Sequence, residues 1–347
     1  MSKLTPRENY LKMMKGEVPE SVPIYSLGPA LKGAPPTVRV GPTVLSGAQA
    51  FLPGIPDPNG RVDCWGIKYI ATKETGNQAI PEPGVFLLED IRKYRDVLKL
   101  PQLPDGFSWE EQAKKDIAAS RIDRTQSCAM ALAMFSPFQQ TMALMGFTEG
   151  LCAFFEEPEL VKEMLNWMVD FFVPHIVNVM DYYKPDVMFF ADDTATKSNP
   201  FISLEMFKDI LKPIYMKMAK PVMERGIPIQ FHNCGRCEDF LADKIDFGVK
   251  VWDPAQVDNN LDEVKRKFGN KMCIAGGFEY KVPPESKVDE GQIRQMVRDT
   301  VDRYAPGGGY AYSGSAFLNP TNDNDKQVNA WIAEESYDYC DGWYTRH

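Results

Sequence analysis

The segment Ile227-Pro-Ile-Gln-Phe-His-Asn-Cys-Gly-Arg-Cys237 is the part of the sequence from which the fold and the site are best interpreted. Its mostly apolar first half predicts a buried strand, and Gly235 ends that strand just after two residues of types that bind metals. Because residues i and i+2 of a strand project to the same side, His232 and Cys234 are expected to point together. An imidazole and a thiolate that converge at a strand end are suited to binding zinc.

Two other interpretations of this segment stay open from spacing alone. A histidine beside an apolar run is often a hydrogen-bonded core residue, and free cysteine is among the most buried residue types. Cys234-Gly-Arg-Cys237 is also a C-x-x-C pair, which is redox-active in thioredoxin-like proteins. That setting expects the pair to open a helix early in a small βαβ unit, whereas here the pair lies two-thirds of the way along a large chain.

Composition and charge limit the class of protein. The 347 residues are 44% apolar, which supports a full core, and this length fits either two domains or one large barrel. A net charge of -9 argues against nucleic acid or an anionic membrane as the main partner. No apolar run approaches the length of about 20 residues that crosses a bilayer, and residues 1–7 lack the apolar core of a signal peptide, so we expect a cytoplasmic protein.

The seven cysteines are an odd number scattered along the chain, which is unlike a disulfide framework, so we expect free thiols.

Strand and helix patterns alternate along most of the chain. The expected strands are 22–25, 63–72, 126–132, 186–191, 227–231, 249–252, 272–276 and 310–313. The expected helices are 5–16, 88–99, 109–121, 158–183, 203–225, 238–245, 261–268, 285–304 and 323–341. This alternation predicts an α/β fold with parallel strands, and about eight units match a single (β/α)8 TIM barrel domain over residues 1–347. An open doubly wound sheet is the alternative, and the Gly/Pro-rich residues 28–60 predict a long excursion.

Polar residues follow several of the expected strands, where a barrel carries its active site. They are Asp192, Asp193, His232, Cys234, Asp253, Glu279, Ser313 and Ser315. An aspartate after a strand is also a common N-cap of the next helix, so each of these residues has a structural interpretation as well. Their recurrence at strand ends favours one shared site.

Several motifs together resemble the uroporphyrinogen decarboxylase superfamily. They are Thr5-Pro-Arg-Glu8, Ala191-Asp-Asp-Thr194, Phe231-His-Asn-Cys-Gly235, Trp252-Asp-Pro-Ala-Gln256 and Ala275-Gly-Gly277. The resemblance covers nearly the whole chain apart from residues 28–60, and it implies a (β/α)8 barrel. The superfamily contains the decarboxylase and corrinoid-dependent methyltransferases. The decarboxylase binds substrate carboxylates through an Arg-Gln-Ala-Gly-Arg-Tyr segment, whereas the matching Tyr25-Ser-Leu-Gly-Pro-Ala-Leu-Lys32 has no arginine. The methyltransferase branch is therefore favoured.

The resemblance to that branch implies zinc on the His-x-Cys pair, His232 and Cys234. In the methylcobalamin:coenzyme M enzymes a further cysteine lies on the last barrel strand, but the matching stretch here is Tyr310-Ala-Tyr-Ser-Gly-Ser315. The third ligand is therefore open. Cys273 is included in the expected metal set, and the other candidates are Cys237, Glu279, Asp192 and Asp193.

The chain most resembles the first methyltransferase of O-demethylase systems. Such an enzyme moves a methyl group from a small donor, here expected to be an aryl methyl ether, to a Co(I) corrinoid. Because the chain has no Asp-x-His-x-x-Gly motif, the cobalamin is expected on a separate corrinoid protein. The alternatives are a methylcobalamin:thiol methyltransferase, the decarboxylase and a non-catalytic binding barrel. A homodimer is compatible with the sequence.

Six residues complete the predicted site. Asp192, Asp193 and Tyr312 are the expected catalytic residues, since proton donation and hydrogen bonding assist a departing heteroatom. The expected substrate-binding residues are Tyr25, Tyr310 and Ser313.

Overall fold

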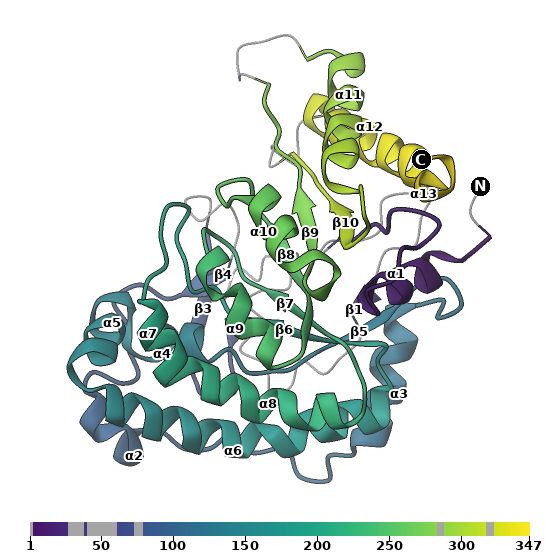
Figure 1. The fold of residues 1–347 in the computed structure, drawn as a ribbon. Helices are drawn as coiled ribbons and strands as arrows, with labels where there is room; N and C mark the ends of the chain where they lie inside the picture. Colours follow the sequence, from purple (N-terminus) through teal and green to yellow (C-terminus); the bar gives the residue numbers. More distant parts are fainter. Residues whose placement is uncertain (1–2, 27–37, 40–60, 73–78, 283–287, 317–322) are drawn as a thin grey trace.

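The computed structural model describes residues 3–26, 38–39, 61–72, 79–282, 288–316 and 323–347. Within them, seven parallel strands form one sheet in the order β1-β5-β6-β7-β8-β9-β10 (Figure 1). The strands are β1 (Val38–Arg39), β5 (Ala129–Leu132), β6 (Val187–Ala191), β7 (Ile229–His232), β8 (Val249–Ala255), β9 (Cys273–Gly277) and β10 (Tyr310–Ser313).

The first extended segment of the chain pairs with the last strand. Ile24 forms a parallel bridge to Tyr312. The backbone N–H of Tyr25 donates to the carbonyl of Tyr312 at 2.9 Å, and the N–H of Tyr312 donates to the carbonyl of Pro23 at 2.8 Å. A doubly wound sheet reverses its strand order at a switch point, whereas here successive strands are neighbours and the chain's first segment meets its last strand. The fold is therefore the predicted α/β (β/α)8 barrel.

Helices lie around the sheet, and most of them connect its strands on the outside, whereas α1 lies at the amino end of the barrel (Figure 1). They are α1 (Pro6–Met14), α2 (Tyr94–Val97), α3 (Trp109–Ser120), α4 (Pro137–Met145), α5 (Phe147–Glu156), α6 (Pro158–Tyr183), α7 (Leu204–Met206), α8 (Lys212–Glu224), α9 (Leu241–Asp246), α10 (Leu261–Phe268), α11 (Glu290–Tyr304), α12 (Asp323–Cys340) and α13 (Trp343–Arg346). Among the described residues, none of these helices combines the length and the apolar character that crossing a membrane requires.

Helices α4 and α5 were not predicted from the sequence. Every residue of α4 except Gln139 is buried, so α4 has no polar face to produce the helical period. Its buried residues include the polar Gln140 and Thr141, and a short segment without a helical period is ambiguous between strand and buried helix.

One predicted barrel strand lies elsewhere. Residues 63–72 contribute to a separate antiparallel sheet of β2 (Arg61–Val62), β3 (Lys68–Ala71) and β4 (Ala79–Pro81). Trp65, before β3, packs its ring against Trp167 and Phe172 of α6. The remaining strand of the barrel sheet is instead β1, which falls inside the Gly/Pro-rich region 28–60. The other residues of that region, and most of the Tyr25–Lys32 segment, lie outside the described part of the chain.

Helix α1 covers the amino end of the barrel. Thr5 and Glu8 form a capping box that begins the helix. Tyr10, Met13 and Met14 are buried among inward-facing side chains at the starts of strands. Side chains of α1 therefore fill the amino end of the barrel interior, although this helix precedes every strand in the sequence.

Strand alternation divides the core into two layers. Val187, Phe189 and Ala191 of β6 belong to the cluster inside the barrel, whereas Met188 and Phe190 belong to the cluster between the strands and the helices. The same parity, with successive residues on opposite sides of the sheet, decides which side chains reach the barrel mouth.

Candidate functional site

His232 and Cys234 converge at the carboxyl end of β7, as predicted. Cys234 Sγ lies 3.3 Å from His232 Nε2, and both side chains are half-buried. The chain turns sharply after them at Gly235, whose φ is +87°. A Cβ atom at Gly235 would lie 2.5 Å from the carbonyl oxygen of Thr196, so only glycine fits this approach.

Asp193 is the third member of the cluster. Its Oδ1 lies 3.8 Å from His232 Nε2 and accepts a 2.7 Å hydrogen bond from the backbone N–H of Cys234. The ligand atoms of Asp193, His232 and Cys234 all lie within 4.8 Å of one another. In the part of the chain that the structure describes, no other group of three His, Cys, Asp or Glu side chains has this arrangement.

The cluster fits a zinc ion in both donor type and spacing. Ligand atoms at bond lengths of about 2.0–2.3 Å in a tetrahedron stand roughly 3.3–3.6 Å apart. The separations of 3.3 Å and 3.8 Å around His232 Nε2 are close to that spacing. Three protein ligands of nitrogen, sulfur and oxygen leave a fourth position open, which is the pattern of catalytic rather than structural zinc sites.

Asp253, near the carboxyl end of β8, orients His232. Its Oδ1 lies 2.7 Å from His232 Nδ1, and because a carboxylate only accepts, the Nδ1–H donates. Burial lowers the pKa of His232, but the charge of Asp253 and its hydrogen bond outweigh burial and hold that pKa well above 6.5. With Nδ1 engaged, Nε2 faces Cys234 and Asp193, which is the orientation that a metal ligand needs.

Burial raises the pKa of the Cys234 thiol, and the neighbouring His232 opposes that increase. Both side chains therefore carry protons that a metal ion would have to displace. Metal binding at this site would release those protons, so the affinity depends on pH.

Asn233, between the two ligands, ties the turn to its surroundings. Its Oδ1 accepts hydrogen bonds from Thr194 Oγ1 at 2.9 Å and from Lys244 Nζ at 2.6 Å. The Lys244 side chain is fully buried, and its Nζ lies 4.0 Å from the centre of the Phe231 ring. Burial lowers the pKa of Lys244 to about 8. The role of Lys244 was not predicted, because nothing in the sequence brings an internal helix residue to the turn.

Asp192 lies outside the cluster. Its carboxylate accepts hydrogen bonds from the backbone N–H groups of Phe138 and Gln139, both at 2.8 Å, and from Tyr215 Oη at 2.7 Å. It therefore binds the first turn of α4, and burial raises its pKa to about 7. The predicted catalytic role of Asp192 does not agree with this placement.

The other proposed third ligands are also elsewhere. Cys273 is the first residue of β9, so it lies at the amino end of the barrel, where its Sγ contacts the carbonyl of Met13 at 3.5 Å. The prediction of Cys273 as a ligand is therefore wrong, because the cluster is at the opposite end. Cys237 is buried with its Sγ 3.5 Å from the carbonyl of Asn233, and Glu279 pairs with Lys281 at 2.9 Å.

The remaining predicted site residues divide by strand parity; they are the expected catalytic residue Tyr312 and the expected substrate-binding residues Tyr25, Tyr310 and Ser313. Tyr310 and Tyr312 belong to the outer cluster, next to Tyr304 and Phe278 respectively, so they do not point into the barrel mouth. Tyr25 belongs to the interior cluster. Ser313, which has the inward parity of Ala311, is half-buried at the end of β10.

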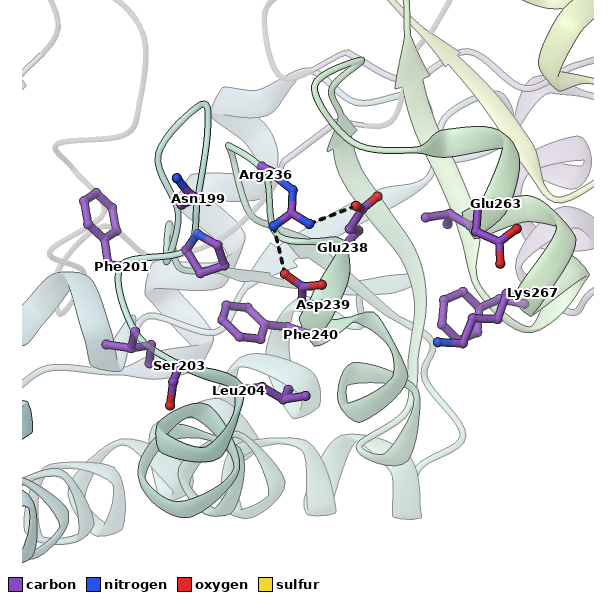
Figure 2. Close-up of a pocket in the computed structure, with 14 residues that line it drawn as sticks. Asn199, Phe201, Ser203, Leu204, Arg236, Glu238, Asp239, Phe240, Glu263 and Lys267 are labelled. Atoms are coloured by element: carbon purple, nitrogen blue, oxygen red, sulfur yellow. Dashed lines mark hydrogen bonds and ion pairs between the residues drawn. The ribbon is translucent and has the colours of Figure 1, made fainter.

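A surface groove of about 830 Å³ lies beside the site. Its walls come from residues 199–204, from the 236–240 segment after β7 and from α10, as Figure 2 shows. Arg236, one of the residues that line it, pairs with Glu238 and Asp239 at 3.3 Å and 2.9 Å (Figure 2). None of the three cluster residues lines this groove, so it is separate from the candidate metal centre.

Comparisons with known proteins agree with this architecture. A solved methyltransferase from Methanosarcina mazei is 15% identical, with a TM-score of 0.59 over 97% of this chain and 100% of that chain, which demonstrates the shared fold. No curated protein sequence matches the chain. The family model for uroporphyrinogen decarboxylase (URO-D) matches residues 86–328, well over half of the sequence. The chain therefore belongs to the uroporphyrinogen decarboxylase family.

Proposed function

We propose that this chain is a methyltransferase that moves a methyl group from a small methylated donor to the Co(I) corrinoid of a separate partner protein. The single observation that carries the proposal is the Asp193–His232–Cys234 cluster, whose donor atoms lie within 4.8 Å of one another at the barrel mouth. A resemblance in fold to the methyltransferase from Methanosarcina mazei supports the same class of reaction.

The residues of the chain have distinct tasks in this proposal. Asp193, His232 and Cys234 would hold Zn²⁺, and Asp253 orients His232. When bound, zinc supplies Lewis-acid polarisation of the heteroatom that loses the methyl group. That heteroatom keeps the electron pair of its broken bond to carbon and takes up a proton, while the methyl carbon bonds to Co(I), which supplies the new pair.

We further propose an aryl methyl ether as the donor. The ring of Phe189 lies 6.0 Å from the His232 ring, centre to centre, inside the barrel. The Phe189 side chain is 1% exposed, so it makes the surroundings of the His232 ring apolar and aromatic, and surroundings of this kind suit a flat aromatic group. Tyr25 and Ser313 have the inward parity needed to contact such a donor.

Metal analysis and a transfer assay test the proposal together. Wild type is expected to bind one Zn²⁺ per chain, and His232→Ala, Cys234→Ala and Asp193→Ala to lose it. Cys273→Ala is the matched control, because it removes a buried inward thiol at the opposite end of the barrel. Transfer from a methoxylated phenol to Co(I) cobalamin is followed by the loss of Co(I) absorbance. Zinc retained by both the His232 and Cys234 variants would contradict the ligand assignment, and unchanged transfer would contradict the reaction.

A further inference from the structure

A chain of hydrogen bonds continues beyond Asp253, away from the candidate metal centre. Gln230 Nε2 donates to Asp253 Oδ2 at 2.5 Å, and Tyr10 Oη donates to Gln230 Oε1 at 2.5 Å. Together with the contact between Asp253 and His232, this gives the continuous path Tyr10–Gln230–Asp253–His232.

The direction of each hydrogen bond follows from the chemistry of its partners. The Asp253 carboxylate can only accept, so the NH₂ group of Gln230 must face it. The amide oxygen then faces Tyr10, whose hydroxyl must donate. Because Oδ2 of Asp253 is occupied by the amide, Oδ1 is left for the Nδ1–H of His232. Each member therefore has one orientation only.

The path runs inside the barrel from one end to the other. Tyr10 comes from α1 at the amino end, and His232 lies at the carboxyl end. Tyr10 is 2% exposed, and Gln230 and Asp253 are both 0% exposed. Since water does not reach these groups, a lost partner is not replaced by solvent, and the remaining polar atoms are left unsatisfied.

We propose that Gln230 and Tyr10 are positioning residues for the metal site, which act through Asp253 on His232. Gln230 holds the carboxylate plane so that Oδ1 receives Nδ1–H and Nε2 turns to the cluster. Tyr10 holds the amide of Gln230 in the orientation that makes this contact. The inference rests on the metal site of the proposed function, and it assigns a role in that site to the first helix of the chain.

Binding of Co²⁺ to the whole purified chain tests this inference. The variants are Gln230→Leu, Tyr10→Phe and the double variant, with Tyr183→Phe as the matched control. Tyr183 Oη donates to Asp116 at 2.6 Å between α6 and α3, so the control loses a comparable hydrogen bond outside the barrel. The readouts are the Co²⁺ dissociation constant, the Co²⁺ absorption spectrum and the melting temperature.

Gln230→Leu is expected to weaken Co²⁺ binding about 10- to 100-fold, as loss of outer-sphere support commonly does, and to shift the Co²⁺ absorption bands. Tyr10→Phe is expected to weaken binding by less, and the double variant to bind as weakly as Gln230→Leu, because Tyr10 acts only through Gln230. Tyr183→Phe should lower the melting temperature alone.

Two results would overturn the inference in different ways. If Gln230→Leu and Tyr10→Phe lower only the melting temperature and keep the wild-type Co²⁺ affinity and spectrum, both residues serve stability alone. The assignment of the metal ligands would then stand without the positioning role. Absence of stoichiometric Co²⁺ binding by wild type would overturn the proposed function and this inference together.

Discussion

Asp192 and Asp193 are adjacent residues of the same type with different surroundings. Both follow β6, whose alternating side chains face the barrel interior and the helices in turn. Asp192 consequently binds the backbone of α4, and Asp193 contacts the backbone of Cys234 at the mouth. The two residues are of the same type, and adjacent positions on or after a strand point to opposite sides of the sheet, so each carboxylate meets different partners.

Replacing each carboxylate by an amide should affect mainly stability at position 192 and mainly metal binding at position 193. Asp192→Asn turns an NH₂ group toward backbone N–H donors, so we expect a loss of about 1–3 kcal/mol in unfolding free energy and little change in zinc affinity. Asp193→Asn removes an anionic ligand, so we expect zinc affinity to fall by at least about 10- to 100-fold with a smaller effect on stability. Urea denaturation and zinc titration measure the two quantities. The reverse pattern would exclude the assignment of Asp193 to the cluster.

Lys244 should make stability depend on pH in the alkaline range. Its pKa is about 8 in the folded chain and 10.5 in the reference state, so the unfolded chain binds more protons between these values. The contribution of Lys244 to the free energy of unfolding therefore rises as the pH increases from about 8 to 10.5, by on the order of 3 kcal/mol in total. Urea denaturation of wild type and Lys244→Met at several pH values measures the difference. A difference that stays constant from about pH 7 to 11 would refute the lowered pKa of Lys244.

The element that defines the site is the turn from β7 into the segment before α9. Gly235 N–H donates to Gln256 Oε1 at 2.6 Å, and Arg236 N–H donates to the carbonyl of Thr196 at 2.8 Å. The turn is thus held between the segments that follow β6 and β8. This contact brings Asp193 and Cys234 together.

Gly235→Ala should disrupt the turn, because the added Cβ would meet the carbonyl oxygens of Thr196 and Ala195 at 2.5 Å and 2.6 Å. We expect a loss of about 2–4 kcal/mol in unfolding free energy and weaker zinc binding. Gly226→Ala is the control, since Gly226 also has a positive φ of +66° but nothing lies within 4 Å of its added Cβ. Equal effects of the two substitutions on stability and zinc affinity would mean that the close approach at Gly235 is unimportant.

At the scale of the whole molecule, the N-terminal helix is part of the barrel core. Tyr10, Met13 and Met14 fill the amino end of the interior, and the segment at Ile24 pairs with β10. Tyr10 therefore contacts Gln230 of β7 and Tyr25 contacts Tyr312 of β10, although both strands lie far along the sequence.

Removal of residues 1–16 should prevent the barrel from folding. Burial of three large side chains contributes about 1.5–3 kcal/mol each, and their sum approaches the 5–15 kcal/mol that stabilises a typical domain. We expect the near-ultraviolet circular dichroism of the truncated chain to be lost. Thr5→Ala is the control, because it removes only a helix cap and should cost about 1 kcal/mol. A truncated chain with the wild-type spectrum would disprove the role of α1 in the core.

The barrel and the pair of His232 and Cys234 could be predicted from the sequence because they depend on local signals. Hydrophobic periodicity specifies strands and helices, and residues two apart on a strand share a side whatever the rest of the chain does. The same parity rule, applied to β10, would have separated Tyr310 and Tyr312 from Ser313.

Only the tertiary structure decided which residues complete the site. The third position of the cluster, the anchoring of Asp192 by α4, the replacement of 63–72 by β1 in the barrel sheet and the contact of Tyr10 with Gln230 all join segments that are distant in sequence. Such contacts depend on how strands and helices pack together, and strand or helix patterns within a short segment do not carry that information.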